Sequence, residues 1–231
     1  MKKVIVLATA IALLATPAFA AIRNSKHDLS SSSAATVKST NIDESCVFCH
    51  TPHGGTTGFQ APLWNRSGTS ASTWSATDLY NSSTLDSASS PTTVLSKVNA
   101  SDAPLCYSCH DGTSLAGGLN NPPASASNAQ PTFTAPNDVV GAQANLNDGS
   151  SALKNDHPIG MDYGTVQTNA GANEFVVETT PNQFVDVLPL FTSTGVMWCS
   201  SCHDVHNQGA GQPLLVKSNA GSALCTTCHV K

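Results

Sequence analysis

One stretch decides the organisation of this chain: Cys46-Val47-Phe48-Cys49-His50-Thr51-Pro52-His53. Its first five residues form a C-x-x-C-H motif, which attaches a c-type haem through both cysteine sulfurs while the histidine ligates the iron from one face. His53 is too close in sequence to reach the opposite face of the same ring. If His53 binds iron, that iron belongs to a second haem, so this octapeptide would bind one haem and hold its neighbour.

Three more C-x-x-C-H motifs follow, and the four motifs together contain every cysteine of the chain. Four such motifs predict four covalently bound haem c groups, which we number in chain order. The predicted attachment sites are Cys46 and Cys49, Cys106 and Cys109, Cys199 and Cys202, and Cys225 and Cys228. The predicted proximal iron ligands are His50, His110, His203 and His229.

Two other uses of C-x-x-C pairs fit this pattern less well. Zinc ribbons do not require a histidine directly after each cysteine pair. Disulfides are common in exported proteins, but a bridge between two cysteines so close in sequence would constrain almost nothing of the fold. We therefore interpret all four motifs as haem attachment sites.

The number of histidines indicates six-coordinate iron. The chain has eight histidines, four within the motifs and four outside them. Four haems with two histidine ligands each require four distal histidines, which is the number available. The candidate distal ligands are His27, His53, His157 and His206. Met161 and Met197 are the competing iron ligands, and we interpret both as packing residues.

Spacing suggests partners for some of these histidines. Residues three apart in a helical turn lie on one face, with Cβ atoms about 5–6 Å apart, so each C-H-x-x-H segment would hold two closely stacked haems. The simplest assignment gives His53 to the second haem and His206 to the fourth. His157 precedes Pro158 in an extended loop and could reach the first or the third haem. His27 could fold back onto its own chain or reach an adjacent subunit.

The N-terminus has the features of an export signal. Lys2 and Lys3 precede an apolar run and a small-x-small cleavage site, Ala18-Phe19-Ala20. We expect a signal peptide at 1–20 and a single tetrahaem domain at 21–231, whose N-terminal arm spans 21–41. The apolar run is too short to be a comfortable membrane anchor. The expected location is extracellular or on the outer cell surface, with the periplasm as the alternative.

Composition indicates a fold built around its cofactors. The net charge of −5 argues against nucleic acid and anionic membranes as partners. Only 11% of residues are charged and 6% are aromatic, so a core made only of protein side chains would be thin. We expect a multihaem cytochrome c, mostly loops with short haem-binding helices and a small β-hairpin, folded around a stacked haem chain. The pattern predicts short helices at 44–50 and 94–99 and a hairpin over 173–188, with strands 175–177 and 184–187.

The motifs resemble those of the tetrahaem extracellular cytochromes that polymerise into conductive filaments. The resemblance extends over the mature chain and includes the four C-x-x-C-H motifs, the C-H-x-x-H form of the first and third, the His157-Pro158-Ile159-Gly160 loop and the early lone His27. It implies bis-histidine haems stacked in a continuous chain and wrapped mostly in loops. It also implies that His27 ligates the third haem of the adjacent subunit, which leaves His157 for the first haem.

These observations lead us to expect electron transfer and no enzyme activity, because bis-histidine iron has no open position for a substrate. The resemblance implies a head-to-tail homopolymer, an extracellular filament that exchanges electrons with redox partner proteins and external acceptors. One alternative is a soluble, monomeric, periplasmic tetrahaem carrier. The other is a multihaem reductase with one five-coordinate haem.

Overall fold

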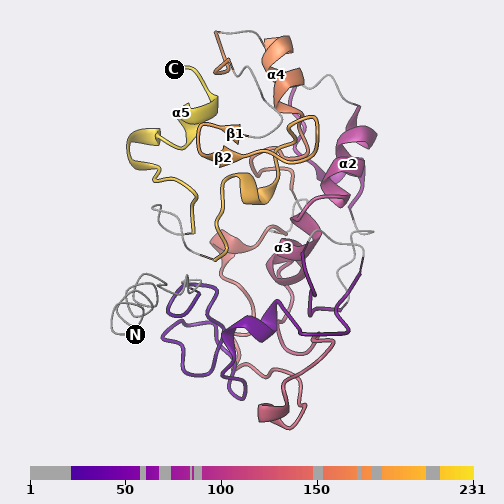
Figure 1. Cartoon of the computed structure of the whole chain (residues 1–231), viewed down its shortest axis with the longest axis vertical. Coiled ribbons are helices and arrows are strands. Elements are labelled where there is room, and N and C mark those ends of the chain that lie inside the picture. The colour runs from indigo at the N-terminus through magenta and orange to yellow at the C-terminus, as the bar shows by residue number, and fades with distance from the viewer. Residues whose placement is uncertain are drawn as a thin grey trace, which may run out of the picture.

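The computed structural model describes residues 22–57, 61–67, 74–83, 85, 90–147, 153–170, 173–177, 184–206 and 214–231. In this part of the chain, short helices and one small sheet are joined by long loops (Figure 1). The expected signal peptide at 1–20 lies outside the described residues. No helix of the described part has the length and apolar character needed to cross a lipid bilayer.

The regular elements are all short, and η denotes a 3₁₀-helix. In chain order they are η1 (Ser45–Phe48), η2 (Ala76–Asp78), α2 (Pro91–Asn99), α3 (Ala103–His110), η3 (Ala124–Ala126), η4 (Ala142–Ala144), α4 (Tyr163–Ala170), β1 (Phe184–Val185), β2 (Leu188–Pro189), η5 (Cys199–Ser201), η6 (Ala220–Ser222) and α5 (Cys225–Cys228). Strands β1 and β2 pair in antiparallel fashion. The four α-helices, the small sheet and the loops of the described residues agree with the expected fold class.

Helix α2 begins where its sequence signals place it. The Ser90 side chain caps the helix by accepting a backbone N–H hydrogen bond, and Pro91 occupies the first turn. The buried side chains of Val94 and Val98 are four residues apart and therefore lie on one face. The helix predicted at 94–99 is confirmed and begins slightly earlier.

The predicted hairpin has a different arrangement. Residues 184–185 pair with 188–189 across a tight turn, and not with residues 175–177. Phe175 instead forms a bridge with His229, beside the fourth motif. Alternating apolar residues indicate that a segment is extended, but they do not identify its partner, and this is why the prediction was wrong in its pairing.

The N-terminal arm folds back onto its own chain. In Figure 1 the N-terminal segment lies in the lower part of the molecule with η3, whereas α2, α4, α5 and the sheet form the upper part and α3 lies between. The Thr40 N–H donates to the Thr132 carbonyl at 2.8 Å. Ile42 is fully buried in a cluster with Phe48 and Leu119. The C-terminal end of the arm is therefore held against distant parts of its own chain.

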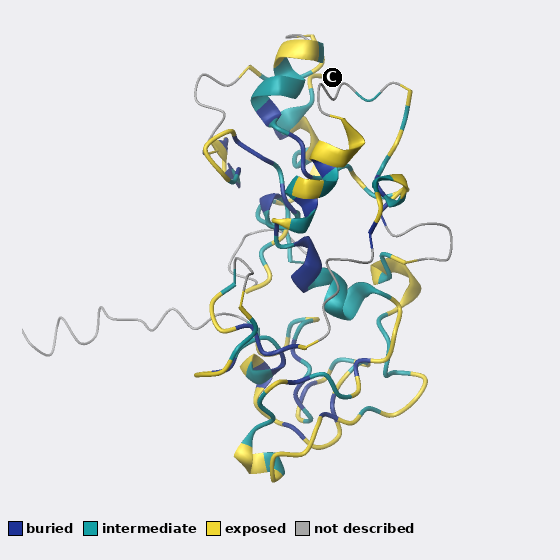
Figure 2. Ribbon diagram, turned by 90° about the vertical axis from the view of Figure 1, so that its right-hand side faces the viewer, coloured by how far each residue is buried: buried dark blue, intermediate teal, exposed yellow. Residues whose placement is uncertain are grey.

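Small buried clusters take the place of one large core. Figure 2 shows the buried residues as short, separate stretches on both helices and loops. The three clusters of buried side chains are Trp74, Leu79, Val94, Val98, Ala103, Leu153 and Met161; Ile42, Phe48 and Leu119; and Tyr163, Val185 and Leu190. Met161 belongs to the first cluster and Met197 packs against the third, which is the packing role expected of both.

Gly160 provides a test of this packing. Its φ is +77°, and a Cβ added there would lie 2.8 Å from Val98 Cγ2 and 3.1 Å from the Val94 carbonyl oxygen. We expect Gly160→Ala to lower the free energy of unfolding by about 1–3 kcal/mol, because it combines left-handed backbone with overpacking. Chemical denaturation checks this. The control is Gly141→Ala, where φ is −64° and no atom lies within 4 Å; equal losses in both variants would contradict the packing argument.

Candidate haem-binding site

The C-x-x-C-H motifs adopt two local structures. Motif 1 (Cys46–His50) and motif 3 (Cys199–His203) begin in the 3₁₀-helices η1 and η5, whereas motif 2 (Cys106–His110) and motif 4 (Cys225–His229) lie at α3 and α5. In motifs 1, 3 and 4 the histidine N–H donates to the carbonyl of the first cysteine, at 2.8, 3.1 and 2.9 Å. A turn closed in this way places both sulfurs and the imidazole on one side, as attachment to one porphyrin requires.

Two backbone hydrogen bonds connect the end of motif 1 with residues 63–65. The Thr51 N–H donates to the Leu63 carbonyl, and the Asn65 N–H donates to the Cys49 carbonyl, both at 2.9 Å. Leu63 adopts a left-handed φ of 53°. Residues 63 and 65 therefore lie alongside the end of motif 1 and are hydrogen-bonded to it.

Motif 3 repeats the arrangement. The Asp204 N–H donates to the Leu214 carbonyl at 2.8 Å, and the Val216 N–H donates to the Cys202 carbonyl at 3.0 Å. Leu214, like its counterpart Leu63, has a left-handed φ, here 54°. The two C-H-x-x-H segments are therefore structural copies. The sequence signal is a Pro-Leu pair after each motif, at 62–63 and 213–214, and sequence reasoning overlooked it.

Three pairs of histidine rings lie close together. The ring centroids are 6.2 Å apart for His50 and His206, 6.1 Å for His110 and His27, and 6.3 Å for His229 and His157. Each pair combines one motif histidine with one histidine from outside the motifs. Among the described histidines, only His53 and His203 have no ring neighbour of this kind.

This spacing fits an iron atom between the rings. An imidazole nitrogen binds a first-row metal at about 2.0–2.1 Å, so two rings on opposite sides of one metal have centres about 6 Å apart. Direct ring packing occurs over about 4.5–7 Å and does not require these particular partners. The pairing of one proximal and one outside histidine in all three cases favours haem ligation.

The backbone orients several of these rings. The Nδ1 atoms of His50 and His110 lie 2.9 Å and 2.6 Å from the carbonyl oxygens of Pro62 and Ala144. His157 Nδ1 lies 3.0 Å from the Pro158 carbonyl oxygen. A carbonyl only accepts hydrogen bonds, so Nδ1 carries the proton and Nε2 keeps a lone pair for the metal.

The surroundings of two of the rings favour their neutral form. Burial lowers the pKa of His27, and positive charge on His110 acts in the same direction. Burial also lowers the pKa of His229, followed by the effect of His157. Because metal ligation requires neutral imidazole, these shifts suit a ligand role.

The observed neighbours differ from those that spacing predicted for His206 and that the resemblance implied for His27 and His157. His27, expected at the third haem of another subunit, lies beside His110 of motif 2 in its own chain. His206, expected at the fourth haem, faces His50 of motif 1. His157, assigned to the first haem, lies beside His229 of motif 4. In each case the ring neighbour comes from a distant part of the chain, which local spacing does not identify.

Cysteines of successive motifs lie close enough to affect one another's pKa. Burial raises the pKa of Cys49 to about 12, and nearby Cys109 of motif 2 acts in the same direction. A hydrogen bond with Cys106 is the largest of the causes that raise the pKa of Cys199. Burial raises the pKa of Cys202, followed by Cys225 of motif 4. These interactions show that motif 1 lies near motif 2, motif 2 near motif 3 and motif 3 near motif 4, while the contact of His50 with His206 also brings the motif 3 segment to motif 1.

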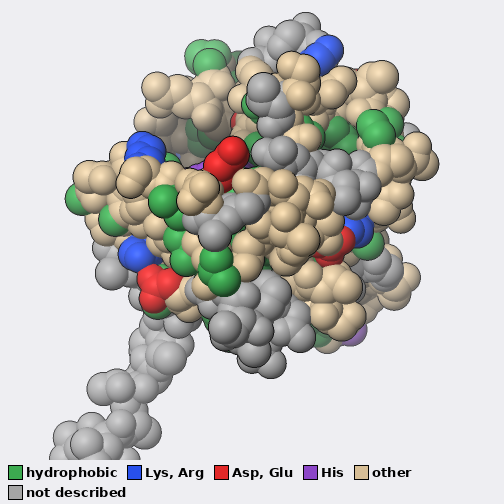
Figure 3. Space-filling view, turned by 90° about the horizontal axis from the view of Figure 1, so that it is seen from above, with side chains coloured by type: hydrophobic (Ala, Val, Ile, Leu, Met, Phe, Trp, Pro, Cys, Tyr) green, Lys and Arg blue, Asp and Glu red, His purple; other side chains and the backbone are tan. Residues whose placement is uncertain are grey.

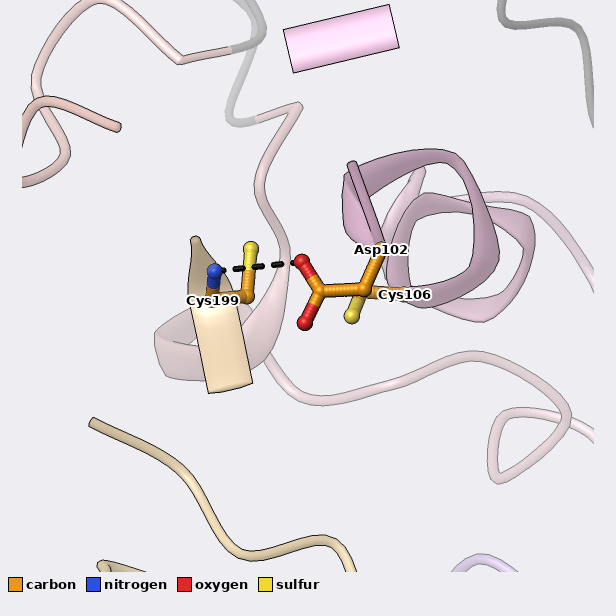
Figure 4. A group of neighbouring side chains, drawn as sticks. All are labelled: Asp102, Cys106 and Cys199. Atoms are coloured by element: carbon orange, nitrogen blue, oxygen red, sulfur yellow. Dashed lines mark hydrogen bonds between the residues drawn. The ribbon is translucent and has the colours of Figure 1, made fainter. Parts of the chain in front are cut away.

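Asp102 links motif 2 to motif 3. It precedes α3, yet its carboxylate accepts hydrogen bonds from the N–H groups of Cys199 and Ser200, at 3.1 and 2.8 Å. Figure 4 shows this carboxylate between the two segments, and its oxygen lies within 4.8 Å of the Cys106 and Cys199 sulfurs. Because both cysteines belong to haem motifs, we assign the cluster to the contact between haem sites and not to a separate metal ion.

The cysteines of the described residues are not joined by disulfides, and the surface carries few charges. All eight cysteines lie in the described part, and none of them forms a disulfide. Figure 3 shows a face on which charged side chains are sparse, in agreement with the 11% charged residues of the sequence.

Comparison with known proteins supports the cysteine assignment. The family described as "Doubled CXXCH motif" matches residues 193–231, which contain motifs 3 and 4. No curated protein matches the chain. The family match indicates covalently bound c-type haem and a multihaem c-type cytochrome, the class of protein that carries out electron transfer.

The contact at Asp102 leads to a prediction. Asp102→Ala leaves two backbone N–H groups of η5 without their carboxylate acceptor, and hydrogen bonds to a charged group contribute about 1.5–3 kcal/mol. We expect a loss of that order in the free energy of unfolding, measured by chemical denaturation of the haem-loaded protein. Asp102→Asn keeps one side-chain oxygen and should lose less. Equal stability of all three proteins would contradict the assigned role.

Proposed function

We propose that the chain binds four bis-histidine haem c groups and transfers electrons along them. The observation that carries this proposal is the set of three ring pairs at 6.1–6.3 Å, each with one motif histidine and one outside histidine. Haem supplies one-electron chemistry at iron. The chain supplies the ligands, their orientation and the spacing.

The geometry supports a revised set of ligands. The first haem would take His50 and His206, the second His110 and His27, the third His203 and His53, and the fourth His229 and His157. The third pair follows because these two histidines remain when the others are assigned. Thr51 Oγ1 and Asn121 Nδ2 both donate to the His53 carbonyl, at 2.9 Å each, and fix the backbone of this ligand.

In this assignment motifs 1 and 3 exchange histidines. His50 and His53 are three residues apart, as are His203 and His206. If the first histidine of each segment serves its own haem, the second serves the haem of the other segment. The shared loop structure of the two segments supports such a reciprocal contact, because two like segments facing each other form a self-complementary contact. The first and third haems would then be a closely held pair.

The order of the cysteine contacts supports a continuous electron path. Motif 1 approaches motif 2, motif 2 approaches motif 3, and motif 3 approaches motif 4. We infer that each electron passes between neighbouring haems, and that the protein has no substrate site, because every iron has two histidine ligands. Exposure, axial ligation and hydrogen bonding would set the individual potentials.

We further propose that copies of the exported chain associate head to tail into an extracellular filament that delivers electrons to external acceptors. The support is the resemblance to filament-forming tetrahaem cytochromes, particularly outer-membrane cytochrome E. Apolar side chains are also exposed beside motifs 1, 3 and 4: Leu63 near motif 1, Val205 near motif 3, and Val177, Phe184, Val187 and Val230 near motif 4.

A monomeric periplasmic carrier is the second candidate. The observation that favours it is His27, which meets motif 2 of its own chain and therefore requires no neighbouring subunit. Both candidates share the same four haems and differ only in assembly.

The ligand assignment can be tested in a background without the first haem, Cys46→Ala with Cys49→Ala. There we expect His206→Ala to create no new high-spin ferric haem, because its iron is absent, whereas His157→Ala should create one at the fourth haem. Electron paramagnetic resonance with spin counting measures both. A new high-spin haem in the His206→Ala protein would show that His206 serves another haem, as spacing alone suggested.

Assembly can be tested by negative-stain electron microscopy of the secreted protein. The filament proposal predicts uniform fibres, and Val187→Asp should shorten or abolish them because it places a charge on the exposed apolar surface near motif 4. Lys38→Gln, an exposed change in the N-terminal arm, is the control and should leave the fibres intact. Well-dispersed single particles of the unaltered protein would favour the monomeric carrier.

A further inference from the structure

Arg66 is a buried cation that the chain leaves incompletely paired. Its exposure is 5%. Within the described residues, neither its Nε nor its Nη1 has a hydrogen-bond partner, and no carboxylate forms an ion pair with it. A buried charge without a counterion is strongly unfavourable in a folded protein. Its position therefore points to an anionic partner that is not an amino-acid side chain of the described part.

The backbone holds Arg66 firmly in this place. Thr56 Oγ1 donates to the Arg66 carbonyl at 2.8 Å, and Arg66 forms a bridge with Leu119. Gly118 has a φ of +77°, and a Cβ added there would lie 3.2 Å from Arg66 Nη2. The absence of a side chain at Gly118 thus leaves room for the guanidinium. The local backbone therefore both fixes the position of Arg66 and provides space for its guanidinium.

Arg66 lies beside motif 1, and its positive charge also acts at motif 2. Asn65, the residue before Arg66, donates its backbone N–H to the Cys49 carbonyl at 2.9 Å and its side-chain Nδ2 hydrogen to the Val47 carbonyl at 2.7 Å. In addition, the positive charge of Arg66 lowers the pKa of Cys49 in motif 1 and of Cys109 in motif 2, against the larger effect of burial. The charge is therefore close to the attachment sites of two different haems.

In the structural copy at motif 3, the corresponding cation is Lys217, which is partly exposed and has a carboxylate partner. Lys217 follows Leu214 by three residues, as Arg66 follows Leu63. Its Nζ donates to Asp186 Oδ2 at 2.7 Å and to Thr227 Oγ1, inside motif 4, at 3.0 Å. The second copy thus pairs its cation with a carboxylate beside the next motif. The first copy has the cation beside the next motif, but no described carboxylate.

We propose that Arg66 binds a haem propionate at the junction of motifs 1 and 2. This inference rests on the proposed function, since the carboxylate comes from one of the four haems. Propionates are the only ionised acceptors that a haem brings, and a guanidinium N–H forms a strong, charge-assisted hydrogen bond with a carboxylate oxygen. Nε and Nη1 are the two unpartnered nitrogens of Arg66, and either can be the donor for this contact. Arg66 is thus a positioning residue that also supports a higher reduction potential at the haem it contacts.

Infrared difference spectroscopy tests the contact directly. Cells are fed 5-aminolevulinate labelled at its carboxyl carbon, which labels the haem propionates and no amino-acid carboxylate. We expect the reduced-minus-oxidised spectrum of the unaltered protein to contain a labelled carboxylate band that shifts in Arg66→Gln, is largely retained in Arg66→Lys and is unchanged in Lys38→Gln. Identical labelled bands in all four proteins would overturn the proposal.

A redox titration supplies an independent readout. We expect Arg66→Gln to lower the reduction equilibrium constant of one haem about tenfold, which is 59 mV for one electron. Arg66→Lys should keep most of the original value, since the charge remains. An unchanged titration in Arg66→Gln would contradict the charge effect.

Two further measurements keep the proposal testable in every case. If the variants do not fold, a high-resolution structure of the haem-loaded protein decides: a propionate oxygen about 2.7–3.2 Å from Nε or Nη1 supports the contact, and a guanidinium paired with a protein carboxylate or stacked on a porphyrin overturns it. The haem-to-protein ratio separates this outcome from the proposed function. Four haems with an unpaired Arg66 would refute only the propionate contact, whereas fewer haems would refute the tetrahaem proposal itself.

Discussion

The separation of paired imidazole rings is the constraint on which the other features depend. At 6.1–6.3 Å, each pair leaves room for one iron and for little else. The rings are held from outside, by carbonyl groups at Nδ1 for His50, His110 and His157. Short turns and long loops suffice for this purpose, because the chain needs to position ligands and does not need to enclose a large side-chain core. The small, separate buried clusters are consistent with a structure completed by its cofactors.

The two C-H-x-x-H segments, at motifs 1 and 3, share one local structure and together contribute ligands or charges at all four proposed haem sites. Each provides a motif histidine, a second histidine, a returning loop and a cation, and each lies next to a helical motif. The cations differ in their partners: Lys217 pairs with Asp186, whereas Arg66 has no described carboxylate. Together with the carboxylate of Asp102 between motifs 2 and 3, they place charges of opposite sign along the proposed haem chain. Such charges influence the potentials of neighbouring haems unequally, because buried charges are weakly screened.

Sequence patterns predicted the local features, but they did not identify which distant residues lie together. The attachment sites follow from C-x-x-C-H, and the start of α2 follows from Ser90 and Pro91. The loop-rich fold class was also predictable from composition. The neighbours of His27, His157 and His206 were not, because residues three apart indicate that two haems are held and not which haem is second. The partner of Phe175 was missed for the same reason, since its bridge is to His229, distant in sequence.

The reciprocal exchange of histidines between motifs 1 and 3 is the central claim, and a high-resolution structure of the haem-loaded protein tests it most directly. The measurement is the identity of the two axial ligands at each iron. We predict His50 with His206 on the first haem and His203 with His53 on the third, each nitrogen about 2 Å from its iron. Finding His53 on the second haem and His206 on the fourth would contradict the exchange and restore the assignment made from spacing.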